Sequence, residues 1–342
     1  MKKHTVRSLS RRAAALVLAL ALALPTVYAH AGEQKLQTSI DLVDGLTYRN
    51  TITDNSERRV ESFSLELEKD SDAYPILLQA AGTVYGAATI NPAVTYAQEL
   101  GYHVLGAVNT DFFSTASGVP IGIVIEDGVY KSSPEHEDAM IITDGQVSLV
   151  DGPSVSLTLV NQRDNSTVKP SHLNKWRSES GGIYLLNQDF SAVSTRTSTP
   201  GWYVRMALME EDEPLTVNST LELAELLQSD QPLAIGDGEY ILTAADASGY
   251  LSVFQSFQVG DRITLTTSCE NEALSHAQWA GGVGDIMVWD GQLTDSSQWT
   301  YAKDGRQPRT ALGMKEDGTL LVYAVDGRQS GYSSGLSQKD LA

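Results

Sequence analysis

The dipeptide Asp-Gly recurs along the chain and constrains the possible folds more than any other feature. It occurs nine times in 342 residues, with the aspartates at positions 44, 127, 144, 151, 237, 290, 304, 317 and 326. Aspartate tolerates the left-handed backbone region and glycine enters it without steric cost, so the pair suits the turn of a β-hairpin. Between runs rich in Val, Ile and Tyr it predicts strand, turn and strand, as in residues 121–133, 140–152, 285–295 and 311–327.

Helical periodicity is sparse in the sequence. One helix is predicted over 91–101, with Asn91 as its cap and Gly101 as its end, and another over 219–229, opened by Ser219. A third begins near the C-terminus, where Ser337 and Asp340 have capping-box spacing. The sequence therefore predicts an α+β fold that is mainly antiparallel β-sheet, with many Asp-Gly hairpins and a few flanking helices.

The N-terminal segment has the pattern of a secretory signal peptide. Five basic residues precede an unbroken Ala/Leu/Val run at 13–24, and small residues follow at Ala29 and Ala31. A bilayer-spanning helix needs about 20 apolar residues, so this run is too short to be one. We therefore predict a signal peptide at 1–31, one domain at 32–342, no transmembrane segment, and a location outside the cell or in the cell envelope.

The charge balance excludes one class of partner. Five of the 24 basic residues and none of the 43 acidic ones precede Gly32, so the chain from Gly32 onward has a formal charge of −24. Nucleic acid is therefore not an expected partner. The six histidines have no metal-ligand spacing, and the acidic loops have no twelve-residue calcium pattern. No cofactor or metal is therefore predicted. Calcium binding by the acidic loops stays an open alternative that no motif supports.

Five short motifs follow one another in the predicted domain. They are Asn-x-x-Phe-Phe from Asn109, Gly-x-Pro-x-Gly at 118–122, the pair Gly281 and Gly282, Arg-Thr-x-x-Gly at 309–313, and Asp-Gly-Arg at 326–328. Their order resembles that of the phosphodiester glycosidase family and covers nearly the whole of 32–342. The resemblance implies a secreted hydrolase that removes a sugar, N-acetylglucosamine in a known case, from a phosphodiester. The implied partner is a carbohydrate phosphodiester or an envelope polysaccharide.

One family segment is missing from the sequence. Family members continue past Asp-Gly-Arg through a helix to a Leu-Asp-Gly-Gly-Gly-Ser segment, whereas this sequence stops at Ala342. We therefore expect the C-terminal part of the domain to be missing. Hydrolase activity is expected if the full-length protein supplies that part.

Asn109 and Asp111 are candidates at the end of an apolar run. Short polar side chains there often close an Asx-turn, and that structural alternative stays open for both residues. The resemblance implies that Asn109 contacts substrate and that Asp111 is a candidate for the catalytic carboxylate.

Arg309, Thr310 and Arg328 are candidates for holding a phosphate. An arginine fork matches two phosphate oxygens and keeps its charge at any relevant pH, but a surface ion pair is the alternative for each arginine. Thr310 could add a hydroxyl to the same phosphate, although a β-branched residue also suits the start of a strand.

The resemblance adds the remaining candidates. It implies that either Asp111 or Asp326 is the catalytic carboxylate, although the place of Asp326 before Gly327 also suits a turn. Gly281 and Gly282 have no side chains, so we expect them to let main-chain amides approach a ligand. The alternative function is a non-catalytic cell-envelope or exopolysaccharide-binding protein with the same fold.

Overall fold

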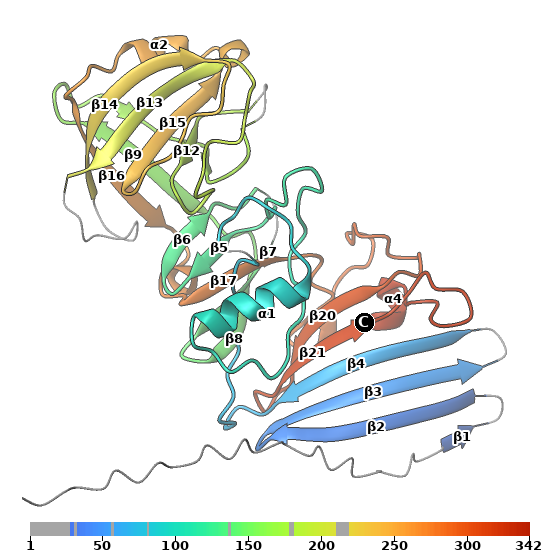
Figure 1. Ribbon diagram of the computed structural model, residues 1–342. Helices are drawn as coiled ribbons and strands as arrows, with labels where there is room; N and C mark the ends of the chain where they lie inside the picture. The colour runs from blue at the N-terminus through green and yellow to red at the C-terminus, as the bar shows by residue number, and fades with distance from the viewer. Residues whose placement is uncertain are drawn as a thin grey trace, which may run out of the picture.

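The computed structural model describes residues 28–30, 33–55, 58–80, 82–135, 138–177, 181–209 and 219–342, so most of the predicted signal peptide lies outside the described residues. Three sheets and one small hairpin account for most of the regular structure (Figure 1). All strand pairs are antiparallel in this part of the chain except β11 with β12, which confirms the mainly antiparallel prediction. No helix in the described ranges is long and apolar enough to cross a membrane.

The two ends of the described chain share the first sheet. Its six strands, in spatial order, are β1 Tyr28–His30, β2 Glu33–Val43, β3 Leu46–Asn55, β4 Arg59–Leu67, β21 Leu320–Val325 and β20 Arg309–Met314.

The five-stranded sheet lies between the other two in Figure 1. It consists of β6 Val129–Ser132, β5 Val124–Glu126, β17 Trp279–Val283, β7 Asp138–Thr143 and β8 Gln146–Val150.

The eight-stranded sheet is built from the middle of the chain. Its strands, in spatial order, are β10 Thr167–Val168, β9 Val155–Asn161, β16 Arg262–Cys269, β14 Ser219–Ser229, β13 Gly201–Leu208, β15 Glu239–Ala245, β12 Tyr184–Leu186 and β11 His172–Leu173. A separate hairpin pairs β18 Val288–Trp289 with β19 Gln292–Leu293.

Asp-Gly pairs occupy tight loops between paired strands. Asp127 and Gly128 connect β5 to β6 with φ values of 49° and 76°, and Asp144 and Gly145 connect β7 to β8 with 51° and 73°. Positive φ at both loop positions is the requirement of the hairpin turn that matches strand twist.

The helices in the described residues are short. They are α1 Ile90–Glu99, α2 Leu251–Gln255, α3 Glu272–Ser275, α4 Gln338–Leu341 and a 3₁₀ turn at Asp246–Ser248.

Two helix-boundary predictions had different outcomes. The cap of α1 is Thr89, not Asn91 as predicted, and Gly101 follows the last turn with φ of 96°. The predicted capping box of α4 is confirmed, because the Ser337 side chain accepts from the Asp340 amide and the Asp340 carboxylate accepts from the Ser337 amide.

The predicted helix over 219–229 is wrong, because these residues form strand β14 between β13 and β16. Leu221 and Leu223 point into the core with exposed Glu222 between them, which is a period of two. The register shifts at Ala224, so the apolar residues after it are out of phase with those before. Because of this offset, the apolar residues of 219–229 have a spacing like that of a helix. Pairing with β13 and β16 makes the segment a strand.

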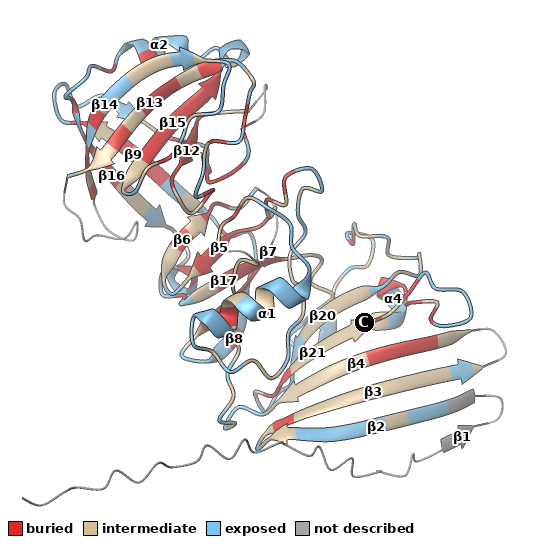
Figure 2. Ribbon diagram, viewed as in Figure 1, coloured by how far each residue is buried: buried red, intermediate tan, exposed pale blue. Residues whose placement is uncertain are grey.

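The five-stranded sheet is apolar on both faces. Ile125 and Ile141 pack with the eight-stranded sheet, whereas Val124, Met140 and Ile142 pack against Leu67, Leu312, Leu320 and Val322 of the six-stranded sheet. Neighbouring residues of a strand point to opposite faces, so each strand contributes to both cores. Figure 2 shows the buried residues gathered in the five- and eight-stranded sheets, with the six-stranded sheet mostly intermediate.

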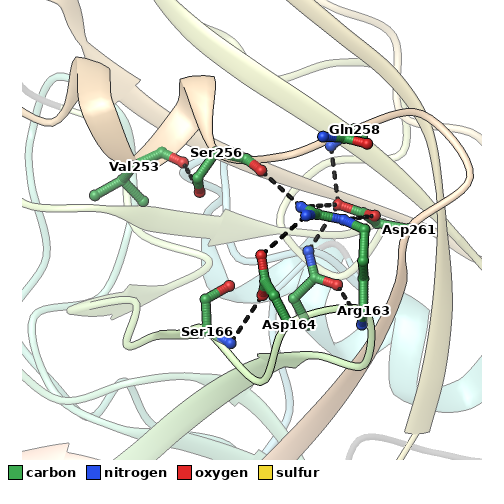
Figure 3. Close-up of polar contacts among 8 residues, drawn as sticks. Arg163, Asp164, Ser166, Val253, Ser256, Gln258 and Asp261 are labelled. Carbon is green, nitrogen blue, oxygen red and sulfur yellow. Dashed lines mark hydrogen bonds and ion pairs between the residues drawn. The ribbon is translucent and has the colours of Figure 1, made fainter.

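A polar network anchors the loops at one end of the eight-stranded sheet (Figure 3). The buried Asp261 carboxylate accepts from Asn161 Nδ2 at 2.7 Å, from Arg163 Nε at 2.7 Å and from the Gln258 amide at 2.9 Å. Hydrogen bonding from Arg163 holds the pKa of Asp261 below its ordinary value. The charged carboxylate therefore stabilises the folded chain.

We expect Asp261→Asn to lower the free energy of unfolding at pH 7 by about 2 kcal/mol, the range for hydrogen bonds to a charged group. Because the folded-state pKa is depressed, this contribution is present above the unfolded pKa of about 3.9 and is lost as the pH falls through the folded value. Urea unfolding at pH 7 and pH 3 measures the gap between wild type and variant. An equal gap at both pH values contradicts this assignment, and the exposed Asp72→Asn serves as control.

Candidate functional site

Segment 106–109 crosses one face of the six-stranded sheet. A β-carbon on Gly106 would lie 2.6 Å from Leu65 Cδ1 on β4, and Thr310 Oγ1 on β20 donates to Asn109 Oδ1 at 3.1 Å. The ladder pairs Thr310 with Ala324 and Ala324 with Phe63, so Thr310 and Leu65 share this face. The structure therefore brings together Asn109 and Thr310, two predicted site residues that lie 201 positions apart.

Asp111 fixes the same segment to the five-stranded sheet. Its backbone has a positive φ of 37°, its amide donates to the Gly282 carbonyl at 3.2 Å, and its carboxylate accepts from the Gly122 amide at 3.1 Å. The Asp111 side chain therefore satisfies a backbone donor 11 residues away, whereas the Asx-turn alternative requires a donor about two residues along the chain.

Gly281 and Gly282 lie inside β17, where both are buried. A β-carbon on Gly282 would lie 2.6 Å from Asp111 Oδ1 and 2.7 Å from Gly122 Cα, and one on Gly281 would lie 2.2 Å from Leu77 Cδ1. The missing side chains therefore allow the segments that carry Asp111 and Gly122 to pack directly on the strand.

Lys175 is a residue that the sequence reasoning missed. It is 1% exposed, and its Nζ donates to the carbonyl oxygens of Ile121 and Gly122 at 3.0 Å each and to that of Pro120. Burial lowers the pKa of Lys175 to about 8, while Glu135 and Asp111 oppose the shift. The three donors of an ammonium match three carbonyls, so Lys175 holds the 120–122 backbone from beneath.

Arg309 anchors a loop. Its Nε donates to Leu336 O at 2.7 Å, its Nη1 to Tyr301 O at 3.1 Å, and its Nη2 to Ala302 O at 2.7 Å and Gly305 O at 2.9 Å. Arg309 directly precedes Thr310 on β20, so the two side chains point to opposite faces of the sheet. The structure therefore places Arg309 away from the face that carries the Asn109 contact.

The anchored loop in turn contacts the Asn109 segment. The Phe112 and Tyr301 rings stack with centroids 4.2 Å apart and an interplanar angle of 11°. Phe113, next in the chain, is 50% exposed. Phe112 thus links segment 107–122 to the loop that Arg309 holds.

Two carboxylates lie opposite each other at the end of this sheet face. The Asp326 amide donates to the Glu61 carbonyl at 3.0 Å, directly beyond the paired residues Val325 and Ser62. Glu61 lies on the same face as Phe63, and Asp326 on the same face as Ala324, so both carboxylates lie on the Thr310 face. Diagonal neighbours on adjacent strands are about 7–8 Å apart, which places Asp326 close to Thr310.

Like charges at opposite positions repel each other, and nearby groups offset the repulsion here. Hydrogen bonding to Glu61, followed by burial and the charges of Glu61 and Asp326, raises the pKa of Tyr332 to about 12, so the phenol keeps its proton at neutral pH. Asn50 Nδ2 donates to Glu61 Oε1 at 3.1 Å, and Arg59 Nη2 lies 3.7 Å from Glu61 Oε2. We call Arg59, Glu61, Asp326 and Tyr332 the carboxylate cluster.

The two acids of the cluster differ in accessibility. Glu61 is buried and has partners on several sides, whereas Asp326 is half-buried and its carboxylate approaches the Tyr332 phenol. The Asp-Gly-Arg motif points to Asp326, whereas Glu61 lies 265 positions earlier in a segment without a motif and is not predicted from the sequence.

Arg328 lies beside the cluster on an exposed turn. Its φ is 59°, in the left-handed region, and its Nε donates to Gln307 Oε1. Within the described residues its two Nη groups form no hydrogen bond or ion pair, so they are available to an anion. No group of three His, Cys, Asp or Glu side chains suited to a metal ion is found in that same part of the chain.

Comparison with known proteins supports the family resemblance over the C-terminal third of the chain. Residues 221–342 match the phosphodiester glycosidase family profile, a range that includes Arg309, Asp326 and Arg328. No curated protein sequence matches the chain.

Two solved structures are similar in fold. A hypothetical protein from Synechocystis aligns over 89% of this chain at 16% identity with a TM-score of 0.68, and a putative exported protein from Burkholderia pseudomallei over 91% at 12% identity with a TM-score of 0.70. The chain spans 55% of the first protein and 88% of the second. At these identities the similarity supports the fold alone.

We expect Gly282→Ala to destabilise the protein by about 1–3 kcal/mol, because the new methyl group must displace Asp111 or the Gly122 backbone. Gly313→Ala is the matched control, since Gly313 also lies in a strand but has no atom within 4 Å of the position that a β-carbon would take. Thermal unfolding of both variants measures the difference. Equal melting temperatures would show that segment 107–122 packs more loosely on β17 than described.

We expect Arg309→Lys to loosen the 301–305 loop, because one ammonium cannot reach the four carbonyls that the guanidinium contacts. Hydrogen exchange at Tyr301, Ala302 and Gly305 should accelerate, and stability should fall by about 1–3 kcal/mol. Unchanged exchange there would contradict the anchoring role.

Proposed function

We propose that the protein hydrolyses the bond between the anomeric carbon of a sugar and a phosphodiester. The observation that carries this proposal is the half-buried Asp326, which continues the sheet face that carries the Asn109–Thr310 contact and lies two residues before the exposed Arg328. The family match over 221–342 supports the reaction class.

The leaving group determines which residues the reaction needs. Glycosidases normally use two carboxyl groups, one that attacks or activates water and one that protonates the departing oxygen. A phosphate ester is already a weak base, so its departure requires cationic stabilisation more than a proton. A single accessible carboxylate next to an arginine therefore meets the requirement.

The described residues divide these tasks among them. The Asp326 carboxylate either attacks the anomeric carbon or takes the proton of the attacking water. Glu61 and the Tyr332 phenol hold Asp326 in position, since the phenol keeps its proton at neutral pH and faces both acids. Arg328 holds the phosphate through its Nη groups, and Arg59 adds a second positive charge next to the pair.

The proposal assigns Asp111 and Arg309 to positioning. Asp111 fixes the Asn109 segment to β17, and Arg309 fixes the loop whose Tyr301 supports Phe112. Both residues therefore act through Asn109 and its neighbours.

A location outside the cell forms part of this proposal, on the basis of the signal-peptide pattern at 1–31. The large negative charge of the predicted mature chain makes local cations necessary for binding an anionic substrate. The substrate is then a sugar phosphodiester of the envelope or of an extracellular polysaccharide.

We expect Arg328→Lys to lower kcat/KM on a sugar-1-phosphodiester by about ten- to hundred-fold, because lysine keeps the charge but loses the fork that matches two phosphate oxygens. A neutral aryl glycoside of the same sugar should be affected little, since it has no phosphate. Asp326→Asn should abolish hydrolysis of both substrates. Steady-state kinetics on the two substrates measures these effects.

Arg306→Lys is the matched control, because Arg306 lies in the same Asp-Gly-Arg-Gln sequence on another exposed loop. Equal losses on both substrates in Arg328→Lys would show that Arg328 does not act on the phosphate. If the full-length wild-type protein hydrolyses no sugar-1-phosphodiester, the non-catalytic polysaccharide-binding alternative replaces the proposal.

A further inference from the structure

A groove of about 430 Å³ opens at one end of the five-stranded sheet, apart from the carboxylate cluster. We call it the turn groove, because the Asp-Gly turns of β5–β6 and β7–β8 form part of its rim. Three aromatic and three polar side chains line it: Tyr74, Tyr102, Trp279, Asp127, Asp144 and Gln278.

Gln278 forms hydrogen bonds to both turns that border the turn groove. Its backbone carbonyl accepts from the Gly128 amide at 2.8 Å, and its side-chain oxygen accepts from the Asp144 amide at 2.8 Å. Its own amide donates to Ile142 O at 3.0 Å. One residue thus fixes both turns next to the start of β17, so the rim is preformed.

One aromatic ring of this groove is mostly exposed. Tyr74 is 63% exposed, while Tyr102 and Trp279 are half-buried. Large aromatic rings normally bury their faces, and an exposed ring with a polar tip is suited to binding a partner that is apolar on one side and polar on the other. A sugar ring has this character, with C–H groups on its face and hydroxyls on its edge.

The aspartates of the turn groove favour a ligand without negative charge. Burial, followed by the charges of Tyr74, Asp127 and Glu126, raises the pKa of Tyr102, in agreement with the close approach of these groups around the groove. Ionised carboxylates accept hydrogen bonds and cannot donate them, so Asp127 and Asp144 suit hydroxyl donors and repel anions.

We infer that the turn groove binds a neutral oligosaccharide, with a sugar ring stacked on Tyr74 and its hydroxyls donating to Asp127 and Asp144. Trp279 lies three positions before Gly282 on β17, about 10 Å along the strand, and Gly282 contacts the Asp111 segment. Because its lining contains two aspartates and no basic residue, the groove holds a part of a glycan that does not carry the phosphate. Binding of this kind does not depend on the proposed hydrolysis and is expected even if that activity is absent.

Calorimetric titration of the purified protein tests the inference, with cellotetraose, maltotetraose and chitotetraose as neutral probes and tetragalacturonate as the anionic probe. At least one neutral probe should bind at millimolar concentrations, and tetragalacturonate should bind at least about ten-fold more weakly. Tyr74→Ala should weaken neutral binding about ten-fold or more. Tyr74 is mostly exposed, so this variant should melt like wild type.

Three further variants keep the test decisive. Asp127→Asn with Asp144→Asn should also weaken binding while keeping both turns, because asparagine tolerates positive φ as well as aspartate does. Tyr250→Ala, at a tyrosine on a loop of the eight-stranded sheet, should bind like wild type, and so should Arg328→Lys. The inference is overturned if no neutral probe binds, if tetragalacturonate binds equally well, if the Tyr74 and aspartate variants bind like wild type, or if Arg328→Lys alone abolishes binding.

Discussion

The strand β17 is covered on both faces, and the rest of the structure depends on this constraint. One side of its sheet packs on the eight-stranded sheet and the other on the six-stranded sheet. A strand with two buried faces must be apolar or small at every position, and β17 meets this requirement with Ala280, Gly281 and Gly282 in a row. The two glycines also leave the space in which the Asp111 segment packs.

The candidate site follows from that packing. The backbone at 120–122 lies on β17 because Gly282 has no side chain, and Lys175 and Asp111 then satisfy its carbonyls and the Gly122 amide. With this segment fixed, Asn109 lies within reach of Thr310 on the neighbouring sheet. The site therefore lies where two sheets meet, and neither sheet forms it alone.

The two acids of the carboxylate cluster, Glu61 and Asp326, differ in their neighbours and therefore in their exposure to solvent. Glu61 and Asp326 lie opposite each other on β4 and beyond the end of β21, an arrangement that repulsion disfavours unless donors surround it. Asn50, Arg59 and the Tyr332 phenol surround Glu61, and Asp326 stays more accessible to solvent. The turn groove has the opposite character, since its carboxylates have aromatic neighbours and no cation among the residues that line it.

The amino-acid sequence determined the local structure wherever a few neighbouring residues decide it. The loops at Asp127–Gly128 and Asp144–Gly145 have the positive φ values that this dipeptide favours, and the capping box of Ser337 and Asp340 opens α4. The family resemblance rests on the order of five motifs along the chain. That order can be identified from the sequence without knowing where the motifs lie in space. Among the site candidates, Asn109, Thr310 and Asp326 were selected in this way and lie on one sheet face.

Only the tertiary structure decided the features that depend on distant partners. Residues 219–229 form β14 because β13 and β16 pair with them, although a bulge gives their apolar residues a helical spacing. Arg309 and Thr310 are adjacent in a motif, yet strand alternation sends them to opposite faces, one toward a loop and the other toward Asn109. Glu61 and Lys175 carry no local signal at all. Their roles arise from pairing and burial between segments tens to hundreds of residues apart, which short-range patterns in a sequence do not specify.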